Sequence, residues 1–179
     1  ARFRDRSAWY HIVVAFDTTQ GTSTNRVKFY VNNTLITQYD TSTYPSQNDQ
    51  SSVNDNVMHE VGNQRGTTRY FDGYMTEVNM IDGLQLTPSY FGYTDSQTGT
   101  WRPKKYTGAY NTTGFYLPLN GSQNVGKDMS GNGCDWQPVK LSGTVPVSKA
   151  TGAFPILNTN NGATVIHPGV RSDSSASNI

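Results

Sequence analysis

Charged residues and cysteine are scarce in this chain. Only 15% of its 179 residues are Asp, Glu, Lys or Arg, and the formal net charge is +1. Nucleic-acid-binding proteins carry Lys and Arg clustered on one face, so this balance gives no electrostatic argument for a nucleic-acid partner. The single cysteine, Cys134, excludes a disulfide within the chain.

Long apolar runs and glutamate are also scarce. No run of about 18 apolar residues occurs, so the sequence predicts no membrane-inserted helix. Coiled coils are rich in Glu, Lys, Ala and Leu, whereas the only glutamates here are Glu60 and Glu77. The abundant residues are Thr, Ser, Asn, Gly and Tyr, with 22, 16, 16, 17 and 11 copies. This composition favours strands joined by turns, and the low charge together with 12% aromatic residues argues against intrinsic disorder.

Apolar and polar residues alternate in the N-terminal part of the chain. Residues 9–16 (WYHIVVAF) are an apolar run that predicts a strand buried on both faces, or on one face with aromatic cover, and residues 26–31 (RVKFYV) show the period of two that is typical of a half-buried strand. Asn32 and Asn33 tolerate left-handed backbone, so they predict a two-residue hairpin turn. A return strand is expected at residues 35–39.

Further strands are expected at residues 57–61, 70–81 and 115–119, with polar loops between them. Thr87 is followed by proline, which predicts a short helical turn at residues 89–92. About seven short strands with regularly spaced turns predict an all-β, antiparallel sandwich or jelly roll. A β-barrel is the alternative.

The expected strand at residues 70–81 has an interrupted alternation. A β-bulge near Thr76–Glu77 would restore the phase, because it inserts one extra residue into one strand of a pair. The bulge would bring the apolar residues of this segment to one side: Phe71, Met75, Val78 and Met80.

Several segments resemble a known family. Residues 9–36 (WYHIVVAFDTT…NRVKFYVNNTLI) resemble the central hairpin of laminin-G and concanavalin-A-like lectin domains, with Asn33 where the "YVNG"-like turn of that family has glycine. Residues 70–92 (YFDGYMTEVNMIDGLQLTPSYFG) resemble the segment that follows, and residues 128–136 (DMSGNGCDW) resemble a Gly/Asn loop of the same superfamily. Over residues 7–178 the chain is similar to a version of this domain found in virion proteins of marine tailed bacteriophages.

The resemblance implies a concanavalin-A-like (laminin-G-like) sandwich over residues 1–137 and an extended C-terminal segment, or a linker to a following domain, at residues 138–179. The family sandwich has strands before the position of Ala1, so these strands are expected from chain outside this sequence or from another copy or protein. An open sandwich would otherwise expose edge strands.

The resemblance also implies a structural protein on the extracellular surface of a virion: a tail fibre, spike or capsid-surface appendage. Its lectin-like domain would adhere to glycan on the host surface. The expected partners are other copies of the chain, other virion proteins and cell-surface glycan, with no nucleic acid and no membrane insertion.

Three alternatives stay open: an architectural capsid decoration without sugar binding, a glycan depolymerase with its catalytic residues outside this chain, and a secreted cellular lectin. Glycoside hydrolysis needs a pair of carboxylates that flank the scissile bond. Glu60 and Glu77 are isolated in the sequence, so we expect this chain not to be an enzyme.

Four aromatic residues are candidates for glycan contact, since sugar sites commonly pair an aromatic ring with amide or carboxylate hydrogen bonds. They lie in loop-rich segments: Trp101, Tyr106, Tyr110 and Trp136. The alternative for each ring is a core or loop anchor, because aromatic side chains bury large areas.

The Gly/Asn loop contains a candidate metal site. Asp128, Asn132 and Asp135 bring side-chain oxygens to the close spacing that Ca²⁺ prefers. No cofactor is required, and zinc is disfavoured because one cysteine and three scattered histidines give no ligand spacing. The favoured alternative is that Asp128 and Asn132 cap a tight glycine turn through side-chain to backbone hydrogen bonds.

Overall fold

The computed structural model describes residues 3–5, 7–64, 71, 73–119 and 125–138. Within these residues the chain forms short β-strands and two single-turn 3-10 helices, with no α-helix. The strand pairs in these residues are antiparallel, which is compatible with the predicted all-β class. The C-terminal segment predicted at residues 138–179 lies beyond the described residues except for Pro138. No helix in the described ranges is long and apolar enough to cross a bilayer.

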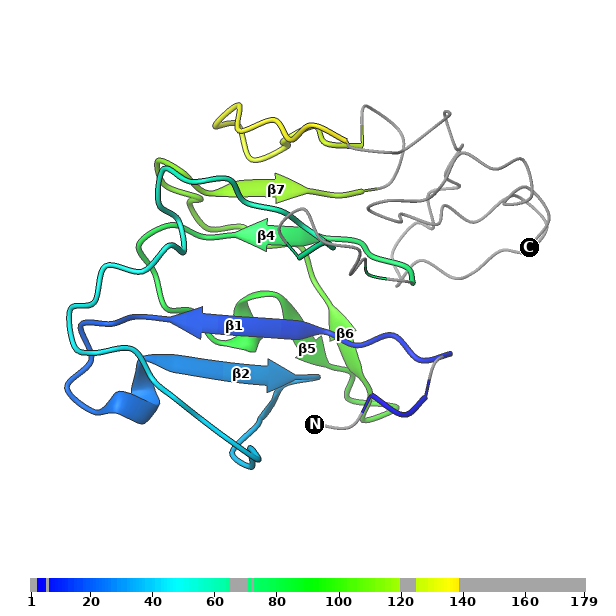
Figure 1. Ribbon diagram of the computed structural model, residues 1–179. Helices are drawn as coiled ribbons and strands as arrows, with labels where there is room; N and C mark the ends of the chain where they lie inside the picture. Colours follow the sequence, from blue (N-terminus) through cyan, green and yellow to red (C-terminus); the bar gives the residue numbers. More distant parts are fainter. Residues whose placement is uncertain (1–2, 6, 65–70, 72, 120–124, 139–179) are drawn as a thin grey trace. The chain divides into compact units, whose positions relative to one another are not determined.

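The chain divides into two compact units that alternate along the sequence. The described parts of Ala1–Asp55 and Gly83–Gly108 form unit 1, and those of Asn56–Asp82 and Ala109–Ile179 form unit 2. Unit 1 contains a three-stranded sheet and a two-stranded hairpin, while unit 2 contains one two-stranded pair (Figure 1).

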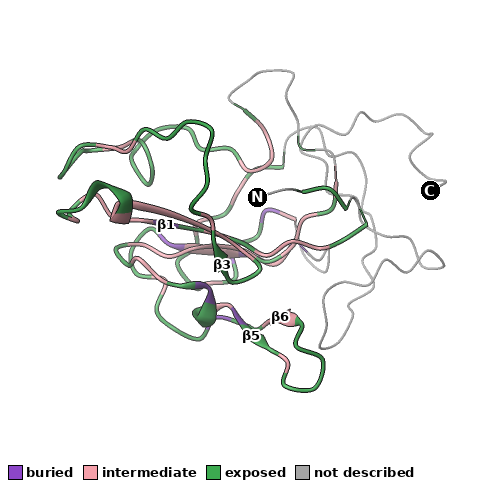
Figure 2. Cartoon of the chain, turned by 90° about the horizontal axis from the view of Figure 1, so that it is seen from below, coloured by how far each residue is buried: buried purple, intermediate pink, exposed green. Residues whose placement is uncertain are grey.

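The three-stranded sheet of unit 1 is formed by β1 (Ile12–Phe16), β2 (Val27–Val31) and β3 (Thr34–Leu35), in that order. A 3-10 turn, η1 (Ser23–Asn25), precedes β2. The first two strands agree with the sequence prediction. The return strand is shorter than expected and ends at Leu35 (β3 is labelled in Figure 2).

The turn between β2 and β3 confirms the predicted hairpin. Asn32 and Asn33 have φ angles of 46° and 67°, and the residues on either side of them are paired. Asn32 also holds the start of β1: its Oδ1 accepts a hydrogen bond from the backbone N–H of His11 at 2.8 Å. The turn therefore depends on asparagine for its backbone shape and for a side-chain acceptor.

We expect Asn33→Ala to lower the free energy of unfolding by about 1 kcal/mol, because left-handed backbone costs a residue with an ordinary Cβ about 1–2 kcal/mol. Asn33→Gly should retain the stability, since glycine adopts positive φ without strain. Urea denaturation of the two variants checks this. Equal stability of the alanine and glycine variants would contradict a left-handed Asn33.

One face of the sheet in unit 1 is apolar and partly exposed. Ile12 and Val14 are 50% and 58% exposed. Their cross-strand partners are Val31 and Phe29, which share the same face because directly opposed residues point the same way. On the opposite face of β1 Ala15 is buried, so the strand has the second of the two expected forms, burial on one face.

The second hairpin of unit 1 follows a short helical turn. The turn, η2 (Pro88–Tyr90), starts with proline after Thr87, as the sequence predicts. Strands β5 (Gly92–Thr94) and β6 (Trp101–Pro103) then pair. Figure 2 shows that few of the described residues in either unit are fully buried.

Unit 2 is organised by β4 (Val78–Met80) and β7 (Phe115–Leu117). Leu117 and Leu119 are buried at the centre of its hydrophobic cluster. Partly buried apolar side chains surround them: Met75, Val78, Phe115, Val125 and Trp136. Because Leu117 comes from β7 and Val78 from β4, the cluster packs against the strand pair.

Among the described residues of 70–81 only Val78–Met80 form a strand, so the expected long strand with a bulge near Thr76–Glu77 is not seen there. Glu77 has a φ of 56°, which breaks the extended backbone. Met75 and Val78, on either side of it, both pack against the Leu117 cluster. Phe71 is exposed, so the expectation that it lies inside was wrong. No strand forms at residues 57–61, where one was also expected.

Candidate functional site

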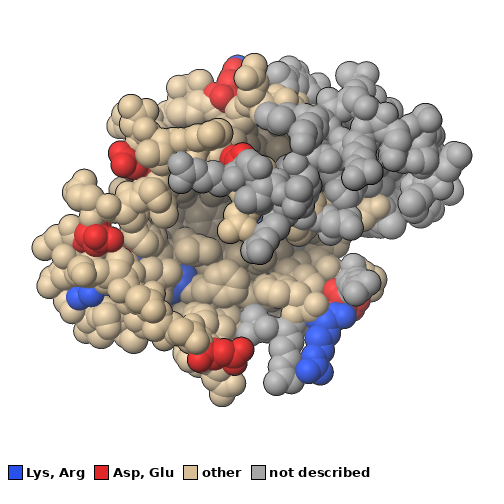
Figure 3. All heavy atoms as spheres, in the orientation of Figure 1, with Lys and Arg blue, Asp and Glu red and all other residues tan. Residues whose placement is uncertain are grey.

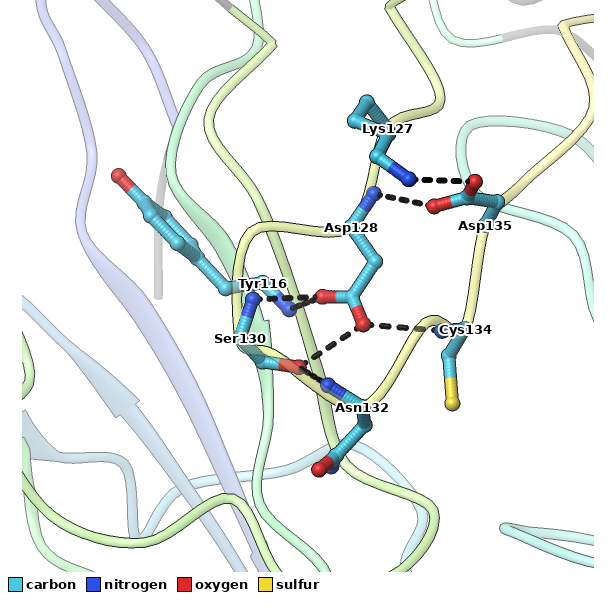
Figure 4. A network of polar contacts seen from close by, with 7 residues as sticks. All are labelled: Tyr116, Lys127, Asp128, Ser130, Asn132, Cys134 and Asp135. Atoms are coloured by element: carbon cyan, nitrogen blue, oxygen red, sulfur yellow. Dashed lines mark hydrogen bonds and ion pairs between the residues drawn. The ribbon is translucent and has the colours of Figure 1, made fainter.

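The Gly/Asn loop of unit 2 is built around the carboxylate of Asp128, which is 5% exposed. Its Oδ1 accepts the backbone N–H groups of Tyr116 and Ser130, each at 2.9 Å. Its Oδ2 accepts the Ser130 hydroxyl at 2.8 Å and the Cys134 N–H at 2.9 Å (Figure 4). Four donors thus use the acceptor capacity of one carboxylate.

The other two candidate metal ligands stabilise the same loop. Asp135 Oδ1 accepts the Asp128 N–H at 3.0 Å, and its Oδ2 lies 2.8 Å from Lys127 Nζ. Asn132 Nδ2 donates to the carbonyl oxygens of Asn111 and Gly114. The sequence therefore correctly groups Asp128, Asn132 and Asp135, and the loop is tied to the segment that leads into β7.

These residues do not fit Ca²⁺. Both oxygens of Asp128 and both of Asp135 face N–H or O–H donors, whose partial positive charge would oppose a cation. In the described part of the chain no group of three or more His, Cys, Asp or Glu side chains is placed to hold a metal. The geometry matches the capping alternative, in which Asp128 organises the turn.

Two of the candidate aromatic residues lie in unit 1 and act as anchors. Trp101 Nε1 donates to His11 Nδ1 at 3.0 Å, and a Cβ added at Gly92 would lie 2.4 Å from the indole ring. Tyr106 is 7% exposed, and its ring stacks on Phe91 with centroids 5.1 Å apart. Little of the Tyr106 ring is left for a ligand.

The other two candidates lie in unit 2. Trp136 packs on Phe115 with ring centroids 4.8 Å apart and belongs to the hydrophobic cluster. Tyr110 is partly exposed, and its ring is nearly parallel to that of Tyr116, with centroids 6.3 Å apart. The four candidates are thus divided between the two units.

Tyr110 lies beside polar groups that the sequence analysis missed. Its hydroxyl donates to Asn79 Oδ1 at 2.7 Å, and the Tyr116 hydroxyl donates to Glu77 Oε2 at 2.7 Å. Burial, reinforced by the Glu77 carboxylate, raises the pKa of Tyr116 well above its ordinary value. We call Glu77, Asn79, Tyr110 and Tyr116 the tyrosine cluster.

The contact between His11 and Trp101 makes unit 1 sensitive to acid. Burial lowers the pKa of His11, and protonation at Nδ1 would remove the acceptor that Trp101 uses. A histidine with a lowered pKa binds its proton less readily in the folded than in the unfolded state. Stability is therefore complete above about pH 6.5 and falls as the pH drops from there through the folded pKa.

We expect His11→Gln to flatten this part of the stability curve, measured by urea denaturation between pH 7 and pH 5, because glutamine does not titrate. His59 is exposed, with its Nδ1 2.8 Å from the carbonyl oxygen of Val57, so His59→Gln is the matched control. An unchanged slope in His11→Gln, or the loss of the slope in His59→Gln, would assign the pH dependence to another group.

No family model, curated protein or solved structure matches the chain. The class that the structure defines is an all-β protein with small antiparallel sheets and almost no helix in its described ranges.

Proposed function

We propose that this chain is part of a structural protein of a tailed-bacteriophage virion. It would be displayed on the particle surface as a tail fibre, spike or capsid appendage and would adhere to host glycan through a concanavalin-A-like sandwich. The observation that carries the proposal is the hairpin of residues 9–36, one of the segments on which the family resemblance rests. Its antiparallel strands and its left-handed Asn32–Asn33 turn have the form that the resemblance implies.

The exposed apolar face of the sheet in unit 1 supports a two-layer arrangement. A sheet with an apolar face gains stability when a second layer covers that face. Ile12 and Val14, with Phe29 opposite Val14, are side chains of the kind that line the inside of a sandwich. An opposing sheet would explain why these residues are apolar.

The surface and loops suit an extracellular setting. Figure 3 shows Lys, Arg, Asp and Glu as isolated groups on a face formed mostly of other residues, in line with the net charge of +1. Several loops are held by an aspartate that accepts nearby backbone N–H groups: Asp17, Asp95 and Asp128. Loops fixed in this way can present side chains to a partner while the strands stay unchanged.

The packing of the candidate aromatic residues favours one alternative, an architectural decoration that binds no sugar. Tyr106 is buried, and Trp101 and Trp136 contact neighbours within their own units. Rings used in this way contribute to stability and leave fewer platforms for a saccharide.

A glycan array probed with the purified protein, followed by an assay for reducing ends released from any bound polysaccharide, tests the proposal. We expect binding to a subset of glycans without release of reducing ends, and we expect mass spectrometry to detect the chain in purified virions. Binding to no glycan, by a chain that is present in virions, would favour decoration. Release of reducing ends would favour a depolymerase, and absence from virions would contradict the assignment to a virion.

A further inference from the structure

We propose that the tyrosine cluster of unit 2 is a contact site for an uncharged saccharide. This inference rests on the proposed adhesive function and deepens it, because it assigns the residues and the ligand class. Of the four aromatic candidates suggested by the sequence, the cluster includes only Tyr110.

The strand pair β4–β7 brings the cluster together. Asn79 and Tyr116 are directly paired across the two strands, so their side chains share one face. Tyr110, from the loop before β7, lies beside Tyr116 with an interplanar angle of 21°. Both rings are partly exposed and Glu77 is exposed, so the cluster is accessible from solvent.

The hydrogen bonds of the cluster define what a ligand must supply. The Tyr116 hydroxyl uses its proton on Glu77, and the raised pKa of Tyr116 keeps the phenol protonated. The phenol oxygen and the carboxylate of Glu77 can therefore only accept further hydrogen bonds. A matching ligand carries several hydroxyl donors, as a saccharide does, together with an apolar C–H face that can lie on a tyrosine ring.

The charge of the cluster selects among such ligands. Glu77 carries the only formal charge of the cluster, so an acidic glycan would meet a like charge, whereas a neutral one would not. A single carboxylate is too few oxygen ligands for Ca²⁺.

The test is an NMR titration of the full chain with ¹³C-labelled tyrosine rings. Maltohexaose and a β-galactan hexasaccharide serve as neutral probes, and a polygalacturonate hexamer serves as the acidic probe. We expect the signals of Tyr110 and Tyr116 to shift with at least one neutral probe and not with the acidic probe. If a neutral probe binds but the signals of both tyrosines stay unmoved, the proposed site is wrong, whereas the adhesive function remains supported.

Substitutions distinguish a loss of binding at the tyrosine cluster from a loss caused by altered folding. We expect Tyr116→Phe to weaken neutral binding about 2- to 10-fold, as the loss of one net hydrogen bond does. The matched control is Tyr93→Phe, at an exposed tyrosine of unit 1, which should bind as the parent chain does. Equal loss in both variants would overturn the site.

A second variant covers the case in which Tyr116→Phe does not fold. Glu77→Gln keeps the shape and an acceptor oxygen but removes the charge, so it should allow the polygalacturonate probe to bind. Continued rejection of that probe by Glu77→Gln would overturn the charge argument. If the parent chain binds none of these probes and no glycan on the array, the proposed function itself fails.

Discussion

Asp128→Asn is expected to lower the free energy of unfolding by about 3 kcal/mol. The substitution places an amide N–H₂ group among hydrogen-bond donors that need an acceptor. Each buried polar group left without a partner costs about 1–3 kcal/mol. Either oxygen of Asp128 could become the amide nitrogen. In both cases two of the four donors from Tyr116, Ser130 and Cys134 lose their partner. Urea denaturation followed by tryptophan fluorescence measures the loss.

Asp135→Asn is the matched control for this substitution. It makes the same chemical change in the same loop, but its carboxylate is exposed, so we expect a clearly smaller effect. Similar losses in the two variants would contradict the view that Asp128 organises the loop.

The pH dependence of stability in the parent chain and in Asp128→Asn gives a second measurement. Burial alone would raise the pKa of Asp128, but the hydrogen bonds from Tyr116, Ser130 and Cys134 outweigh burial and lower it. The stability it contributes is therefore present above about pH 4, the ordinary pKa of aspartate, and is lost as the pH falls through the folded pKa. Asp128→Asn should show a weaker loss below pH 4 than the parent chain.

Gly126→Ala is expected to lower the free energy of unfolding by about 3 kcal/mol, the upper part of the range for overpacking substitutions. A Cβ at this position would lie 1.8 Å from the carbonyl oxygen of Trp136, whose N–H donates to the Gly126 carbonyl at 2.7 Å. Any shift of the Trp136 backbone that relieves this clash also disturbs the packing of the Trp136 ring on Phe115. The substitution should therefore also change the fluorescence of Trp136.

Gly21→Ala is the control for Gly126→Ala. No atom lies within 4 Å of a Cβ added there, so we expect a change within about 1 kcal/mol, stabilising if the backbone suits alanine. Chemical denaturation compares both variants with the parent chain. A Gly126→Ala variant as stable as Gly21→Ala would show that residues 126 and 136 are not in close contact.

Local patterns predicted the parts of the fold that depend on neighbouring residues. Strand β1 follows from a continuous apolar run and β2 from alternation, and the turn after β2 follows from two asparagines that accept left-handed backbone. The left-handed φ of Glu77 also falls where the alternation in the sequence changes phase. In each case the cause lies within a few residues of the effect.

Features that depend on distant pairing could not be predicted. The tyrosine cluster exists because Asn79 is paired with Tyr116, and no local pattern sets a register between segments so far apart. The predicted strand at residues 57–61 is absent, and strand formation depends on pairing and packing with other segments more than on local propensity.

The Gly/Asn loop shows a different limit of sequence reasoning. The spacing of Asp128, Asn132 and Asp135 correctly placed the three residues in one structure, but the same oxygens suit a metal or a backbone cap. The direction of the nearby N–H groups decides between these roles, and in this loop they point at the carboxylates. That direction is a property of the folded backbone, which the order of side chains does not specify.

A cryo-EM structure of the intact virion tests the central claim most directly, namely that this chain belongs to a two-layer, lectin-like sandwich on the particle surface. We expect density for the chain on the outside of the particle, with a second sheet packed on the face that carries Ile12 and Val14. A map in which that face borders only solvent would contradict it, as would virions that lack the chain.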